Sequence, residues 1–326
     1  MAKMIGLRFT VFCRGMLPAV SIAVMLAGLA GAQQTSSGAA CIQRQALQDA
    51  WWTGPLLANS ANTLPRGHFL IEPYIYDVIA PPSHTLGSRL YFEYGFADRF
   101  TLGAIPIVGY NKPENGPSSS GIKIGDISLL AQYRLTQSHE HSWVPTTAIQ
   151  VQQTFPTGKY DRLGTRPSDG LGTGAYSTTV ALNSQTYFWL SNGRILRMRL
   201  NVSESFSSKA EVKDVSVYGT LNGFRGRAEP GKSLFVDAAW EYSMTRNWVF
   251  ALEATYQHTG NTTVVGAQNS ENVRIDSGRS WAFGFAPAIE YNVSPSLGII
   301  LGARVIPPGH NSSGSVTPVM AINFVH

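Results

Sequence analysis

From about Phe69 to the C-terminus, apolar and polar residues alternate with a period of two, which indicates β-strands with two different faces. In the clearest segment one face is apolar and the other is acidic or hydroxylated: Leu234, Val236, Ala238, Trp240 and Tyr242 against Asp237, Glu241 and Ser243. The pattern predicts about twelve strands, near residues 68–78, 86–95, 99–110, 122–135, 143–155, 174–190, 194–206, 232–244, 247–258, 279–292, 296–306 and 315–325. Their lengths suit tilted strands of about ten residues that cross a membrane.

The connections between these segments alternate in length. Short links fall at residues 96–98, 136–142, 191–193, 245–246 and 293–295, and longer ones at 111–121, 156–173, 207–231 and 259–278. Short periplasmic turns and long extracellular loops produce this sorting, whereas a soluble β-sandwich has no reason to show it. The sequence therefore predicts an all-β, transmembrane, antiparallel up-and-down β-barrel over residues 68–326.

The N-terminal residues carry no strand pattern. Residues 1–32 have a basic start, an apolar run from Met16 to Leu29 and a small-residue end at Ala30-Gly31-Ala32, which is typical of a cleaved secretory signal peptide. Residues 33–67 should then stay in the periplasm or enter the lumen as a plug. Trp51 and Trp52 favour the plug, because two adjacent indoles are costly to leave in water.

Composition supports the barrel and excludes some partners. Only 14% of the residues are charged, compared with about 25% in a soluble domain. The signal holds three of the 25 basic residues, so the mature chain has 22 basic against 20 acidic residues. This balance favours no nucleic-acid partner. Cys13 leaves with the signal, and Cys41 alone can form no internal disulfide.

The alternation also predicts which charged side chains face the lumen, since charge on the lipid face is unfavourable. The predicted lumen-lining residues are Arg89, Glu93, Asp126, Arg134, Arg197, Arg199, Asp237, Glu241, Glu253, Glu290 and Arg304. Arg197 and Arg199 lie two residues apart on one strand, so they either pair with carboxylates such as Glu241 or Glu253 as a strut, or stay open and favour anions and aromatic solutes.

Aromatic side chains on the opposite face fall near the ends of the strands, where girdles meet the lipid headgroups. The girdle beside the short turns is predicted to contain Tyr94, Phe100, Tyr133, Tyr242, Trp248 and Tyr291, and the girdle near the long loops Tyr110, Tyr176, Tyr256 and Trp281.

The sequence contains few features that indicate an enzyme. The common nucleophile-elbow, zinc-protease and phosphate-loop motifs do not occur. His139-Glu140-His141 is weak as a metal site because no further ligands lie nearby in sequence. We therefore expect no catalytic residue, metal or cofactor. An outer-membrane lipid hydrolase with His258 at the outer rim, or a closed structural or surface-interaction barrel, remains an alternative.

Several segments resemble the outer-membrane family named for the meta-pathway of phenol degradation. They include Trp52-Thr53-Gly54-Pro55-Leu56, Thr63-Leu64-Pro65-Arg66-Gly67-His68-Phe69, Gly125-Asp126-Ile127-Ser128, Pro156-Thr157-Gly158-Lys159-Tyr160-Asp161 and Ala321-Ile322-Asn323. The resemblance implies an outer-membrane transporter for aromatic or other hydrophobic compounds, and it supplies no catalytic residues. Phe324 is followed by Val325-His326, whereas such barrels often end in Phe.

Together these observations favour an outer-membrane channel or uptake transporter for small solutes of unknown identity. Its expected partners are outer-membrane lipids and the barrel assembly machinery.

Overall fold

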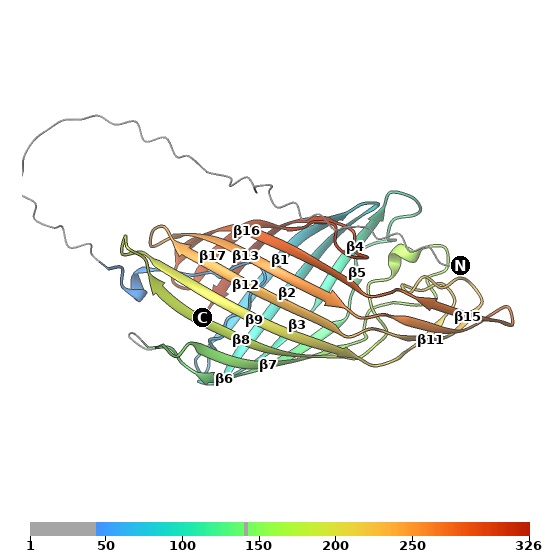
Figure 1. Ribbon diagram of the computed structural model, residues 1–326, viewed down its shortest axis with the longest axis horizontal. Coiled ribbons are helices and arrows are strands. Elements are labelled where there is room, and N and C mark those ends of the chain that lie inside the picture. Colours follow the sequence, from blue (N-terminus) through green and yellow to red (C-terminus); the bar gives the residue numbers. More distant parts are fainter. Residues whose placement is uncertain (1–43, 140–142) are drawn as a thin grey trace, which may run out of the picture. The chain divides into compact units, whose positions relative to one another are not determined.

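The computed structural model describes residues 44–139 and 143–326. Over this part of the chain the strands form a closed, antiparallel, twelve-stranded β-barrel, in which β1 pairs with both β2 and β18 and so completes the ring (Figure 1). Among the same residues, no helix is long and apolar enough to cross a membrane. The predicted signal peptide, Cys41, and Glu140 and His141 of the His139-Glu140-His141 motif lie outside the described residues.

The predicted strands and the observed ones agree closely. Ten strands of the barrel are continuous: β1 (Phe69–Ala80), β2 (Ser83–Ala97), β7 (Thr146–Phe155), β8 (Ser177–Trp189), β9 (Ile195–Ser207), β12 (Ser233–Ser243), β13 (Trp248–Thr259), β16 (Ser280–Ser294), β17 (Leu297–Ile306) and β18 (Ser315–Val325). Agreement is good because burial of one face fixes the register of each strand at period two.

The remaining two strands of the barrel are interrupted. Pro106 separates β3 (Phe100–Ile105) from β4 (Ile107–Pro113), since proline has no N–H to donate to the ladder. Gly125-Asp126 separates β5 (Lys123–Ile124) from β6 (Ile127–Thr136). Both β3 and β4 pair with β2, and on their other side β3 pairs with β6 and β4 with β5, so each broken strand still spans the wall.

Two of the long connections are not loops, and on this point the sequence prediction was wrong. They contain β10 (Ala210–Lys213), β11 (Phe224–Glu229), β14 (Thr263–Gln268) and β15 (Glu271–Asp276), which form a separate four-stranded sheet. This outer sheet extends past the end of the barrel opposite the short turns (Figure 1). It has its own core of Val212, Phe224, Ala228 and Val264.

Side chains of the barrel alternate between exposed and buried along each strand. On β13, Phe250 and Leu252 are 44% and 39% exposed, while Glu253 is fully buried. The predicted girdle residues are all exposed or half-buried: Tyr94, Phe100, Tyr110, Tyr133, Tyr176, Tyr242, Trp248, Tyr256, Trp281 and Tyr291. The rings of Trp248 and Tyr291 lie 4.6 Å apart beside the short turns.

Candidate functional site: the lumen and the segment that enters it

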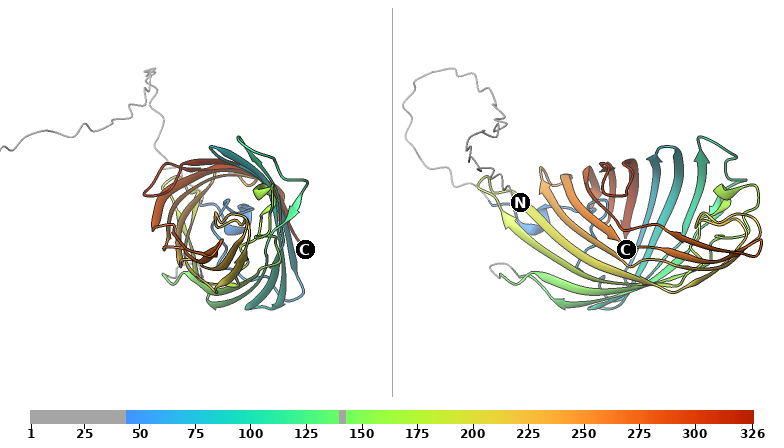
Figure 2. Two further views of the ribbon diagram at one scale, coloured as in Figure 1. Left: turned by 90° about the vertical axis from the view of Figure 1, so that its right-hand side faces the viewer. Right: turned by 45° about the vertical axis from the view of Figure 1, so that its right-hand side comes forward.

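Residues 44–68 run through the half of the lumen that adjoins the short turns; we call them the N-terminal segment. The segment starts beside the β8–β9 and β12–β13 turns, where Gln45 N–H donates to Gly193 and Trp51 N–H donates to Arg246. It leaves the lumen at the β2–β3 turn, where the Thr63 hydroxyl donates to the Asp98 carbonyl. Viewed from the end of the barrel, the segment (blue) lies within the ring of strands (Figure 2, left).

Two buried carboxylates of the wall accept the main-chain N–H groups of this segment. Glu253 on β13 accepts from Leu56, Leu57 and Ala58, at 2.8–3.2 Å. Glu290 on β16 accepts from Thr53 at 2.9 Å and Gly54 at 3.1 Å. An extended segment has no secondary structure to satisfy its own N–H groups, so these carboxylates take the place of a neighbouring strand.

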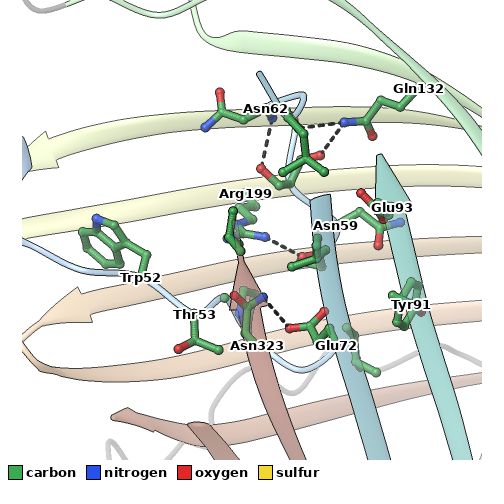
Figure 3. A pocket seen from close by; sticks show the side chains of 18 of the residues that line it. Trp52, Thr53, Asn59, Asn62, Glu72, Tyr91, Glu93, Gln132, Arg199 and Asn323 are labelled. Atoms are coloured by element: carbon green, nitrogen blue, oxygen red, sulfur yellow. Dashed lines mark hydrogen bonds between the residues drawn. The ribbon is translucent and has the colours of Figure 1, made fainter. Parts of the chain in front are cut away.

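Main-chain carbonyls of the segment are satisfied by cationic and amide side chains. The Arg199 guanidinium donates to the Ala58 carbonyl at 2.8 Å, and Asn201 donates to the carbonyl of Asn59 at 3.1 Å. Gln132 donates to the carbonyls of Ser60 and Asn62 at 3.1 and 2.9 Å (Figure 3). The wall is therefore acidic where the segment presents N–H groups and rich in donors where it presents carbonyls.

The amide donors belong to a buried network across β6 to β9. Asn183 donates to Gln132 at 3.0 Å and to Gln150 at 3.1 Å, and Asn201 donates to Asn183 at 2.6 Å. These hydrogen bonds favour one orientation of the Asn183 amide, because a flip would turn its two donor contacts into contacts between acceptors.

Arg197, Arg199 and Glu241 form a buried ionic cluster on β9 and β12. Arg197 lies directly opposite Glu241 and binds it through two hydrogen bonds. Arg199 contacts the same carboxylate, with its Nε 3.1 Å from Oε2. The Arg197 guanidinium also stacks over Trp52 of the N-terminal segment, 4.5 Å from the ring centroid. Of the two arrangements that the sequence left open for the arginine pair, the structure shows the one in which both contact a carboxylate.

Glycines allow the segment to approach the wall. Gly54 has a φ of +121°, a conformation that favours glycine. Gly95 on β2 lies so close to the segment that a Cβ there would stand 2.0 Å from the Pro65 carbonyl oxygen. Both positions tolerate no side chain without a shift of the segment.

Two cavities remain in the lumen, one on each side of the innermost residues of the segment. The inner cavity has about 210 Å³ and a polar lining that includes Glu72, Glu93 and Arg199 (Figure 3). The outer chamber has about 630 Å³, and Leu56 and Leu57 form its floor. Its walls come from the outer halves of the strands, and its charged lining residues among those described are Arg89 and Arg304.

A comparison with protein families identifies the chain. A family described as "Putative MetA-pathway of phenol degradation" matches residues 54–306. This chain belongs to that family. Among curated proteins, no sequence matches it.

A solved outer-membrane channel shares the fold of this family member. The COG4313 outer membrane channel from Pseudomonas putida F1 is 14% identical, with a TM-score of 0.60, and the match covers 83% of this chain and all of that one. The KdgM porin in complex with oligogalacturonate is 9% identical with a TM-score of 0.43, covering 78% and 98%. The β-domain of the Bordetella autotransporter BrkA is 10% identical, also at 0.43, covering 80% and 100%. At 14% identity the likeness to the COG4313 channel concerns the fold alone, and the two matches with a TM-score of 0.43 carry no argument.

The remaining predicted lumen residues of this family member lie in different surroundings. Asp237 is fully buried on β12 with no hydrogen-bond partner among the described residues. Arg134 is half-buried and lies two residues from Gln132, toward the short turns. Asp126 accepts hydrogen bonds from Gly158 and Thr173 and so ties an outer loop to the break between β5 and β6. The alternation places Asp126 on the inward face of its strand, but it does not predict these loop partners.

Tyr218 belongs to the same group of outer loops. Its hydroxyl donates to the Thr173 carbonyl at 2.5 Å. Burial, reinforced by the Asp126 carboxylate, raises the pKa of Tyr218 to about 12, so the phenol stays protonated and keeps donating at neutral pH.

The hydrolase alternative gains no support from the geometry around His258. His258 faces outward, but its neighbours across the ladder are Leu234 and Trp281 rather than a serine. Among the described residues, no group of three or more His, Cys, Asp or Glu side chains could hold a metal ion.

Sequence reasoning missed Glu72, Tyr74 and Tyr91, which also line the lumen cavities. Glu72 accepts a hydrogen bond from Asn323 at 3.0 Å (Figure 3). The alternation along residues 68–78 already contained the signal, because it places Glu72, Tyr74 and Tyr76 on one face.

Proposed function

We propose that this chain is an outer-membrane channel for small aromatic or otherwise hydrophobic solutes, with a lumen narrowed by its own N-terminal segment. It would reach the outer membrane through the predicted signal peptide and the barrel assembly machinery. Family membership and the fold support an outer-membrane barrel. Twelve strands leave a lumen between the filled interior of eight-stranded barrels and the wide pore of sixteen-stranded porins.

The outer chamber is the observation that carries the proposal. It combines a volume of about 630 Å³ with aromatic rings from Tyr74, Tyr76, Tyr91 and Phe235. This volume falls in the range of small-molecule sites. A closed structural barrel would gain more stability by filling the space, since close packing of side chains is favourable.

Solute flux into proteoliposomes tests the proposal. Vesicles that contain the full chain should swell in isosmotic L-phenylalanine, which crosses lipid slowly, and should not swell in raffinose, which is too large for a narrow lumen. Vesicles with heat-unfolded protein are the control. Absence of swelling with both the full chain and a variant lacking residues 44–58 would contradict a channel function.

A further inference from the structure

We infer that the outer chamber is a binding site for aromatic carboxylates, with Arg89 and Arg304 holding the carboxylate and the tyrosine and phenylalanine rings holding the arene. The inference rests on the proposed channel function and specifies its substrate class. The proposed function requires only an aromatic or hydrophobic solute, whereas this inference also requires a negative charge on the solute.

The charge of the chamber is the first argument. Of the described residues that line it, the charged ones are both arginines, and the other polar ones are neutral, including Gln150, Gln152 and Gln257. Arg89 is exposed within the chamber and Arg304 is half-buried. A neutral hydrocarbon that displaces water from them would leave both guanidinium groups without a partner, which is unfavourable. An anionic ligand would neutralise both.

The bonding of the two arginines is the second argument. Arg304 donates from Nη2 to Gln257 at 3.0 Å, and its buried Nε has no hydrogen-bond partner among the described residues. Arg89 donates from Nη1 to the Tyr91 hydroxyl at 3.4 Å. Asp237 and Glu253 act on Arg304 electrostatically, but neither forms an ion pair with it within 4.0 Å. Both guanidinium groups therefore keep donors for a ligand.

Arg197 and Arg199 differ from Arg89 and Arg304 in their partners. Those two arginines share Glu241 and contact the N-terminal segment, so their donors are used within the protein. Arginine presents a planar fork of donors that matches a carboxylate in a bidentate arrangement. Arg89 and Arg304 retain this capacity toward the outer chamber.

The aromatic lining is the third argument. The Arg304 guanidinium lies 5.5 Å from the Phe235 ring centroid, and Tyr74 and Tyr91 meet edge to face at 5.6 Å. An arene that enters beside these rings gains edge-to-face contacts and can stack against a guanidinium. Leu56 and Leu57 supply an apolar floor. A ring with one carboxylate satisfies both kinds of lining at once.

Fluorine NMR of the full chain in lipid nanodiscs tests the inference without any transport step. The probe is 4-fluorobenzoate, with 4-fluorobenzyl alcohol as the neutral isostere. We expect saturable binding of the benzoate and at least about tenfold weaker binding after Arg304→Gln or Arg89→Gln, since a hydrogen bond to a charged group contributes roughly this factor. Arg134→Gln, a lumen arginine outside the chamber, is the matched control and should leave the affinity unchanged.

Three results would overturn the inference: no saturable benzoate binding, equal affinity for the alcohol, or an equal effect of Arg134→Gln. If unlabelled cyclohexanecarboxylate displaces the probe as well as benzoate does, the aromatic half is wrong. Circular dichroism and thermal unfolding verify that each variant is folded. Binding of the benzoate without solute flux would contradict only the channel function. Solute flux without binding of the benzoate would contradict only this inference.

Discussion

Ala58 of the N-terminal segment donates its N–H to Glu253 on β13 at 2.8 Å, and the same carboxyl group also accepts from Leu56 and Leu57. The two residues are 195 positions apart in the chain. The extended segment offers these N–H groups no main-chain partner of its own, so the Glu253 side chain takes the place of a neighbouring strand. This contact, together with Glu290, fixes the segment inside the barrel.

The first prediction concerns this contact. Glu253→Gln should loosen the segment, because the amide keeps one acceptor and turns an N–H₂ donor toward main-chain donors. Hydrogen exchange measured by mass spectrometry should show faster exchange at the amides of Leu56, Leu57 and Ala58. Glu271→Gln, at the tip of the outer sheet, is the control. Unchanged exchange in the Glu253 variant would mean that the carboxylate does not hold the segment.

The second prediction concerns the ionic cluster. Glu241→Gln leaves Arg197 and Arg199 buried without their carboxylate, and loss of one partner from a buried ion pair typically costs about 3–5 kcal/mol. Urea unfolding in lipid vesicles measures the change. The exposed Glu204 on β9 is the matched position, and Glu204→Gln should cost about 0–1 kcal/mol. Similar costs at both positions would contradict a structural role for Glu241.

The third prediction concerns the lipid face. Leu252→Arg should lower the free energy of unfolding by about 2–4 kcal/mol, because it places a cation against the hydrocarbon layer. Leu252→Ala measures the loss of the leucine side chain alone and should cost less. If the two variants unfold at the same urea concentration, Leu252 does not face lipid.

The fourth prediction concerns the outer sheet. Phe224 is fully buried in the core of this sheet, and Phe-to-Ala changes in a core cost about 3–5 kcal/mol. Since this core is separate from the barrel, Phe224→Ala should open the outer sheet to trypsin at Arg225 and Arg227 while the barrel stays protected. Val265→Ala, at a half-buried position on the neighbouring strand, is the control. Degradation of the whole chain would show that the two cores unfold together.

The barrel strands could be predicted from the sequence because each buries one face, so period two is imposed all along the wall. The outer sheet could not. Its strands are four to six residues long, and the β14–β15 turn uses Asn269 and Ser270, both at positive φ, instead of the Asn-Gly pair that signals a hairpin.

The lumen was predictable in part. The alternation turns Glu253, Glu290 and Arg304 inward, but it says nothing of what each side chain binds. The contacts of Glu253 and Glu290 depend on a segment without periodicity that lies about two hundred positions away. Arg197 and Glu241 differ in this respect, because their strands are neighbours and a regular ladder brings them opposite each other.

Single-channel conductance in planar bilayers tests most directly whether the N-terminal segment narrows the channel. The full chain is compared with a variant that lacks residues 44–58, and both are first shown by circular dichroism to be folded barrels. The account predicts a conductance several-fold higher in the deletion variant, because the cavities on the two sides of the segment would merge into one path. Equal conductance of the two folded proteins would contradict it.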